Sequence, residues 1–119
     1  MNTKTLAAAL TVAYAVAKVD GFADQETATL AKEMKSYNLS DEQKDRVLAL
    51  YKEMSTFEAI TIIRESSQED TNEAEALTIL TLLADNEVSD KEIGALKLMG
   101  TLCGFKGMDV EEAHRVIGF

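Results

Sequence analysis

Two short acidic turns contain most of the residues that could do chemistry in this chain. The first turn is Asp20–Glu26 and the second is Asp85–Glu92. Carboxylate oxygens are the ligands that Ca²⁺ and Mg²⁺ prefer in proteins. If the two turns face each other, four carboxylates converge and form a candidate site for one of these cations. Its ligands are Asp20, Glu26, Asp85 and Glu92.

The same carboxylates have an alternative interpretation as helix caps. Each turn ends one helical pattern and opens another. Acidic side chains such as Asp24, Glu26 and Glu92 stabilise a helix N-terminus by interacting with the helix dipole, without any ligand. The distance between the carboxyl groups of Asp20 and Asp85 distinguishes the two interpretations, because a shared cation requires these groups to lie within about 6 Å of each other.

The rest of the chain lacks a recognisable catalytic motif. It has no phosphate-binding loop, dinucleotide fingerprint, His/Cys metal cluster or nucleophile elbow. The one histidine, His114, is expected to be a partly exposed helix residue, and the one cysteine, Cys103, is expected on an apolar helix face as a buried, inert thiol. We therefore assign no catalytic or cofactor-binding residue and predict that the protein is not an enzyme. An enzyme using paired carboxylates would need a concave pocket beside the acids.

Composition and charge narrow the class of protein. The chain has 119 residues, 46% of them hydrophobic, no proline and a net charge of −9. This length and composition predict one domain spanning 1–119. The negative charge opposes binding to nucleic acid, which needs clustered Lys and Arg, and docking on anionic lipid. A single cysteine fits a reducing compartment, so we expect a cytoplasmic location.

The N-terminal apolar stretch Leu6–Ala17 resembles a secretory signal. Only one lysine precedes it, and its apolar pattern runs on through Val19 into the first acidic turn. We therefore interpret it as the first helix of the domain. It is too short for a membrane span, so we predict no direct membrane insertion.

The remaining pattern is helical throughout, because Ala, Leu, Glu and Lys dominate the chain. We predict an all-α fold of about seven helices, near residues 3–19, 24–37, 41–54, 56–66, 71–85, 90–103 and 109–117. Helix starts are marked by Ser or Asp followed three residues later by Glu or Gln. These pairs are Ser40–Gln43, Ser55–Glu58, Asp70–Glu73, Ser89–Glu92 and Asp109–Glu112. Gly104 is expected to end the sixth helix in a left-handed conformation.

Two segments, Leu6–Val19 and Leu77–Ala84, are apolar on nearly every side. A helix of that kind lies in the centre of a bundle. We expect these two helices to pack together with the others around them. Aligning the chain on Asp20 and Asp85 also reveals weak self-similarity, which predicts two pseudo-symmetric halves.

The segments Ala17–Gly21, Leu83–Glu92 and Leu102–Phe105 resemble the TerB-like family, named for a tellurite-resistance protein. Related domains occur in a membrane-anchored DnaJ-type co-chaperone. The resemblance implies an all-helical domain with pseudo-twofold halves, linked to tellurite and stress responses. It also implies that an acidic cluster binds a divalent metal, and carried over by position the ligands are Asp20, Glu26, Asp85 and Glu92.

These observations lead to two expectations for function. The first is a small acidic binding module of TerB type that acts through a protein partner and binds Ca²⁺ or Mg²⁺. The alternative is a metal-free structural or oligomerisation domain that uses an apolar surface, for which a homo-oligomer is one form. Phe57, Ile60, Ile62 and Ile63 are the residues expected to supply that surface.

Overall fold

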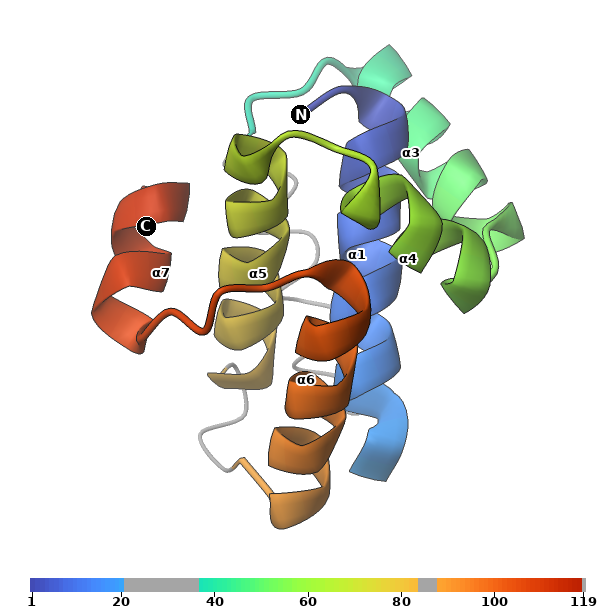
Figure 1. Cartoon of the computed structure of the whole chain (residues 1–119). Coiled ribbons are helices and arrows are strands. Elements are labelled where there is room, and N and C mark those ends of the chain that lie inside the picture. The colour runs from blue at the N-terminus through green and yellow to red at the C-terminus, as the bar shows by residue number, and fades with distance from the viewer. Residues whose placement is uncertain (21–36, 84–87, 119) are drawn as a thin grey trace.

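The structure is a computed structural model that describes residues 1–20, 37–83 and 88–118, with the backbone alone at Asp20. Within these ranges the chain forms six α-helices and one 3₁₀ turn, and no strand (Figure 1). They are α1 (Thr3–Ala17), α3 (Asp41–Glu53), α4 (Thr56–Arg64), α5 (Gln68–Leu83), α6 (Asp90–Cys103) and α7 (Val110–Ile117), with the 3₁₀ turn η1 (Lys18–Asp20) after α1. The predicted all-α class is confirmed.

Helices α1 and α5 form the centre of the bundle, as predicted for the two apolar segments. In Figure 1 they lie side by side, with α3 and α4 beyond α1 and α7 beyond α5. Ala7, Ala8 and Ala9 of α1 have no exposed surface. Small side chains shorten the distance between two helix axes. The alanine-rich sequence of α1 therefore allows α3, α4, α5 and α6 all to pack against it.

The helix count and boundaries differ slightly from the predicted ones. Six α-helices are described where about seven were expected, and the helix expected at 24–37 lies almost wholly outside the described residues. The cap predicted at Asp70 is wrong, because α5 begins earlier, at Gln68. The Ser67 side chain accepts a hydrogen bond from the Asp70 backbone N–H at 3.1 Å and so caps the first turn of α5 instead of Asp70. Serine is a strong N-cap residue.

The other predicted caps are present. In two capping boxes, Ser40–Gln43 and Ser89–Glu92, both reciprocal hydrogen bonds form. Asp109 caps α7 by accepting a hydrogen bond from the Glu112 N–H at 2.8 Å. Ser55 caps α4 through the Glu58 N–H, with its own hydroxyl donating to the Glu58 carboxylate. Each cap satisfies backbone donors that a helix start otherwise leaves unpaired.

The last part of the chain turns back onto α5. Gly104 ends α6 with φ +81°, as predicted, and Gly107 has φ +86° in the loop that follows. Both angles favour glycine because a Cβ makes this backbone region costly. The loop carries α7 to the side of α5 opposite α1, where Ala113 is fully buried (Figure 1). No helix in the described ranges is long and apolar enough to cross a membrane.

Candidate functional site

The end of α1 and the start of α6 meet at one end of the bundle. The turn η1, which closes with Asp20, packs against α6. The apolar residues Val16 and Ala17 of α1 lie in a small cluster with Leu82, and Val88 and Ala95 pack against it. The chain therefore brings η1, which ends at Asp20, next to α6, the helix that begins within the second acidic turn.

Glu92 is the predicted metal ligand whose side chain the structure describes. Glu92 is only 4% exposed, although it lies one turn into α6. Its Oε1 accepts a hydrogen bond from the Ser89 backbone N–H at 3.1 Å, and its own N–H donates to Ser89 Oγ. Among the described residues, Ser89 is the one donor to this carboxylate. A buried carboxylate normally requires further donors or a cation, since burying a charge without compensation is costly.

The other three predicted ligands lie outside the described side chains. Glu26 and Asp85 fall outside the described ranges, and only the backbone of Asp20 is described. Within residues 1–20, 37–83 and 88–118, no three His, Cys, Asp or Glu side chains are placed to hold a metal ion. The four-carboxylate set therefore stays a prediction, with Glu92 as its described member.

A second buried carboxylate, Glu75, was missed at the sequence level. Glu75 lies on α5 and is 3% exposed. Its two oxygens accept three backbone hydrogen bonds from the α6–α7 loop, given by Lys106 at 3.0 Å and by Gly107 and Met108 at 2.9 Å. Glu75 is the single charged residue between Ala74 and Leu83, and this isolation was the available signal. The carboxylate serves as an acceptor that fixes the loop.

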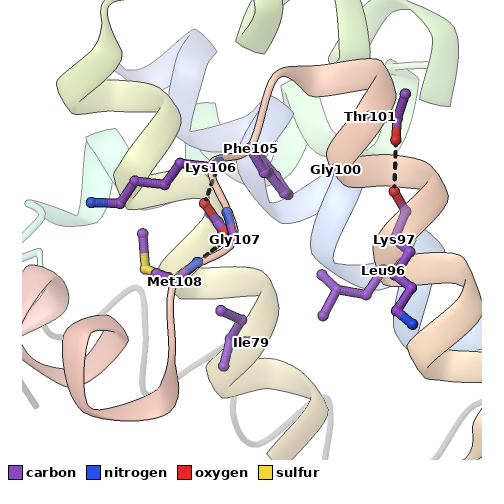
Figure 2. A pocket seen from close by; sticks show the side chains of 10 residues that line it. Ile79, Leu96, Lys97, Gly100, Thr101, Phe105, Lys106, Gly107 and Met108 are labelled. Carbon is purple, nitrogen blue, oxygen red and sulfur yellow. Dashed lines mark hydrogen bonds between the residues drawn. The ribbon is translucent and has the colours of Figure 1, made fainter.

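A hollow of about 360 Å³ opens next to Glu75, between α5, α6 and the α6–α7 loop (Figure 2). Its apolar lining consists of Ile79, Leu96, Phe105 and Met108. The Lys106 amine extends away from it and forms an ion pair with Glu112 at 2.6 Å. The hollow is large enough for a small apolar group.

The hollow is separate from the residues that the sequence analysis considered for chemistry. Its lining includes neither Glu92 nor Cys103 nor His114. The Glu75 carboxylate is already engaged by three donors, so it is poorly suited to accept a proton from a substrate. Because Glu92 does not line it, this hollow is not the pocket that an enzyme using paired carboxylates would require.

Cys103 and His114 have the environments that the sequence predicts. Cys103 is 1% exposed, and burial raises the pKa of its thiol from 9.0 to about 11. A thiol with such a pKa is protonated at neutral pH and is therefore a poor nucleophile. His114 is exposed on α7. The burial of Cys103 and the exposure of His114 are therefore both confirmed.

The apolar surface predicted on α4 is smaller than expected. Phe57 is 84% exposed, but Ile63 is completely buried, and Ile60 and Ile62 are partly buried against the core. The prediction for Ile63 is therefore wrong, because α4 turns this residue toward α1. Another exposed apolar residue, Leu98, lies on α6 and is 64% exposed.

Comparisons with known proteins establish the fold and go no further. No protein-family model matches the chain, and no curated protein matches it either. A solved structure, that of PG1108, a protein of unknown function from Porphyromonas gingivalis W83, is similar with a TM-score of 0.83. The alignment covers 100% of this chain and 91% of that protein, with 21% identical residues. At this identity the similarity supports the shared helical fold alone.

Proposed function

We propose that this protein is a small, non-catalytic helical binding module that holds a divalent cation where η1 meets α6 and acts through a protein partner. The observation that carries this proposal is the environment of Glu92. This residue is 4% exposed, and its carboxylate accepts a single hydrogen bond from the described residues. A cation such as Ca²⁺ or Mg²⁺ would compensate its buried charge.

The position of Glu92 supports the rest of the ligand set. The helix that contains it packs against η1, whose last residue is Asp20. Glu26 and Asp85 complete the set by their places in the two acidic turns. The resemblance to the TerB-like family is the basis for proposing a stress or tellurite response as the setting.

Calorimetric titration of metal-stripped protein with Ca²⁺, Mg²⁺ and Zn²⁺ tests the proposal. The informative variant is Glu92→Gln, because the capping box at Ser40–Gln43 already uses glutamine at the same position. This substitution should keep the hydrogen bond to Ser89 and remove only the charge. The matched control is Glu58→Gln, which removes a charge at the third position of α4, where the side chain is exposed.

Micromolar binding by the wild type should be lost in Glu92→Gln and in the double variant Asp20→Asn, Asp85→Asn, and retained in Glu58→Gln. Absence of binding by the wild type would contradict the cation site and reduce the acidic turns to helix caps. Binding that Glu92→Gln leaves unchanged would exclude Glu92 from the site.

A second candidate function is a metal-free structural or oligomerisation domain. The specific observation in its favour is the exposure of large apolar side chains, with Phe57 at 84% and Leu98 at 64%. Apolar surface that the monomer leaves in water marks a site of protein contact when it is contiguous. This function predicts association that persists in EDTA, which sedimentation velocity measures.

A further inference from the structure

The hollow between α5, α6 and the α6–α7 loop combines apolar walls with one buried charge. Figure 2 shows Leu96 extending from α6 toward Ile79 on α5, while Phe105 and Met108 come from the loop. Glu75 also lines the hollow and is 3% exposed. Apolar walls with a small number of precisely placed polar groups are the usual composition of a small-molecule site.

The carboxylate of Glu75 has the capacity for one more hydrogen bond. Its Oε2 accepts two, from the N–H groups of Gly107 and Met108, whereas its Oε1 accepts one, from the N–H of Lys106. Each carboxylate oxygen has two lone pairs, so Oε1 keeps an acceptor position that no donor among the described residues fills. A ligand in the hollow that carries an N–H or O–H group would satisfy this position.

The charges around the hollow favour a cationic donor over a neutral or anionic ligand. Lys106 is already paired with Glu112 at 2.6 Å, and Lys97, the other base of the lining, is exposed to water. Water and salt screen an exposed charge, whereas burial leaves the charge of Glu75 largely unscreened. The net charge of −9 also attracts cations to the chain and repels anions. An ammonium group therefore complements Glu75 best, because a charged donor forms a stronger hydrogen bond to a carboxylate than a neutral one.

The volume of the hollow limits the rest of the ligand. At about 360 Å³ the hollow lies near the lower end of the range for small-molecule sites. Gly100 and Gly107 contribute backbone to its lining instead of side chains, which leaves this volume open. The apolar part of the ligand is accordingly a single ring or a short branched chain, and a large cofactor does not fit.

We propose that this hollow binds a small organic amine, whose ammonium group donates to Glu75 and whose apolar part contacts the four apolar side chains of the lining. The amine keeps its proton, so the site binds the ligand without changing it. The loop N–H groups that donate to Glu75 lie next to the ligand and report its binding. Glu92 does not line the hollow, so the amine site does not depend on the proposed cation site.

An NMR titration of the full chain in EDTA, followed through the backbone amide signals, tests the proposal. The probes are phenylpropylamine, the neutral phenylpropanol and the anionic phenylpropanoate, which share one apolar part and differ in the head group. The amine should bind with a Kd of about 1 mM or below and shift the amide signals of Gly107 and Met108. The alcohol should bind about tenfold more weakly, and the carboxylate more weakly still. These probes replace a Glu75 variant, which would also disturb the loop that Glu75 holds.

Two variants of the lining locate the bound amine. Leu96→Ala removes one apolar wall and should weaken amine binding about threefold or more. The matched control is Leu98→Ala on the same helix, where the side chain is 64% exposed and outside the lining, and it should leave the Kd unchanged. Lys97→Gln removes a like charge from the lining and should leave amine binding unchanged or strengthen it. The amide spectrum of each variant shows whether it is folded.

Three results would overturn the proposal. The first is no binding of the amine at about 10 mM, or binding that Leu96→Ala leaves unchanged, which would place the amine elsewhere on the acidic surface. The second is equal affinity for the amine and the alcohol, which would make the hollow a purely apolar site. The third is tighter binding of the carboxylate that Lys97→Gln abolishes, which would make the hollow an anion site.

Discussion

The carboxylate of Glu75 on α5 accepts a hydrogen bond from the backbone N–H of Met108, 33 positions further along the chain, with an N···Oε2 distance of 2.9 Å. The N–H groups of Lys106 and Gly107 donate to the same carboxylate. Three successive backbone donors thus converge on one buried acid. The contact fixes the α6–α7 loop and thereby the position at which α7 begins.

Replacing Glu75 with glutamine should destabilise the protein by about 2–4 kcal/mol. The glutamine NH₂ group is itself a donor, so it would face backbone donors and leave at least one buried group without an acceptor. Urea unfolding followed by circular dichroism measures the loss. The matched control is Glu69→Gln on the exposed first turn of α5, which should change the free energy of unfolding by less than about 0.5 kcal/mol. Equal effects of the two substitutions would contradict the structural role of Glu75.

Cys103 should resist alkylation in the folded protein. Its thiol is buried, and its raised pKa of about 11 keeps it protonated at pH 8. Iodoacetamide reacts with the thiolate, so the folded protein should react far more slowly than the same chain in denaturant. Mass spectrometry of samples quenched over time measures both rates. Equal rates would show that the thiol is accessible.

The same thiol should make stability depend on pH at the alkaline end. Because burial raises the pKa from 9.0 to about 11, the folded state keeps a proton that the unfolded state has lost between these values. The contribution of the buried thiol to the free energy of unfolding should therefore be complete below pH 9 and be lost as the pH rises toward 11. Comparison with Cys103→Ala isolates this contribution, since the other titrating groups are common to both chains. A parallel pH dependence of the two proteins would contradict it.

Local rules explain why the helices and their ends could be predicted. The capping box at Ser89–Glu92 and the left-handed end at Gly104 each depend on residues close together in sequence. The central position of α1 follows from an apolar composition on all of its sides. Such features need no knowledge of the three-dimensional arrangement.

Features that depend on distant residues could not be predicted in the same way. Glu75 finds its three donors more than 30 positions away, so its apolar sequence neighbours mark it as unusual but do not indicate what it binds. Helix α4 is apolar on more than one face, and only the position of α1 decides that Ile63 is buried while Phe57 is exposed. The proposed cation site likewise requires two turns to converge, which sequence spacing alone does not determine.

Two glycines, one within α6 and one just after its last residue, should respond in opposite ways to the same substitution. A Cβ at either Gly94 or Gly104 meets no atom within 4 Å, but Gly104 has φ +81° and Gly94 lies in the regular helix. Gly94→Ala should stabilise the monomer by about 1 kcal/mol through helix propensity. Gly104→Ala should destabilise it by about 1–2 kcal/mol, because alanine is strained in the left-handed region. Thermal unfolding of dilute protein measures both, and changes of the same sign would contradict the backbone argument.

The docking of α7 on α5 predicts a sharp contrast between two of its residues. Ala113 is completely buried in a cluster with Ala76, Ile79 and Leu80, whereas Val110 at the start of the helix is 43% exposed. Ala113→Asp places a charge in this cluster and should cost more than about 3 kcal/mol, enough to detach α7 or unfold the chain. Val110→Asp puts an acid in the first turn, where the helix dipole favours it, and should change the free energy of unfolding by less than about 1 kcal/mol.

Urea unfolding and binding of a hydrophobic dye distinguish the two variants, because detachment of α7 exposes the apolar side of α5. If Ala113→Asp had a free energy of unfolding close to that of the wild type, α7 would not be part of the cooperative core.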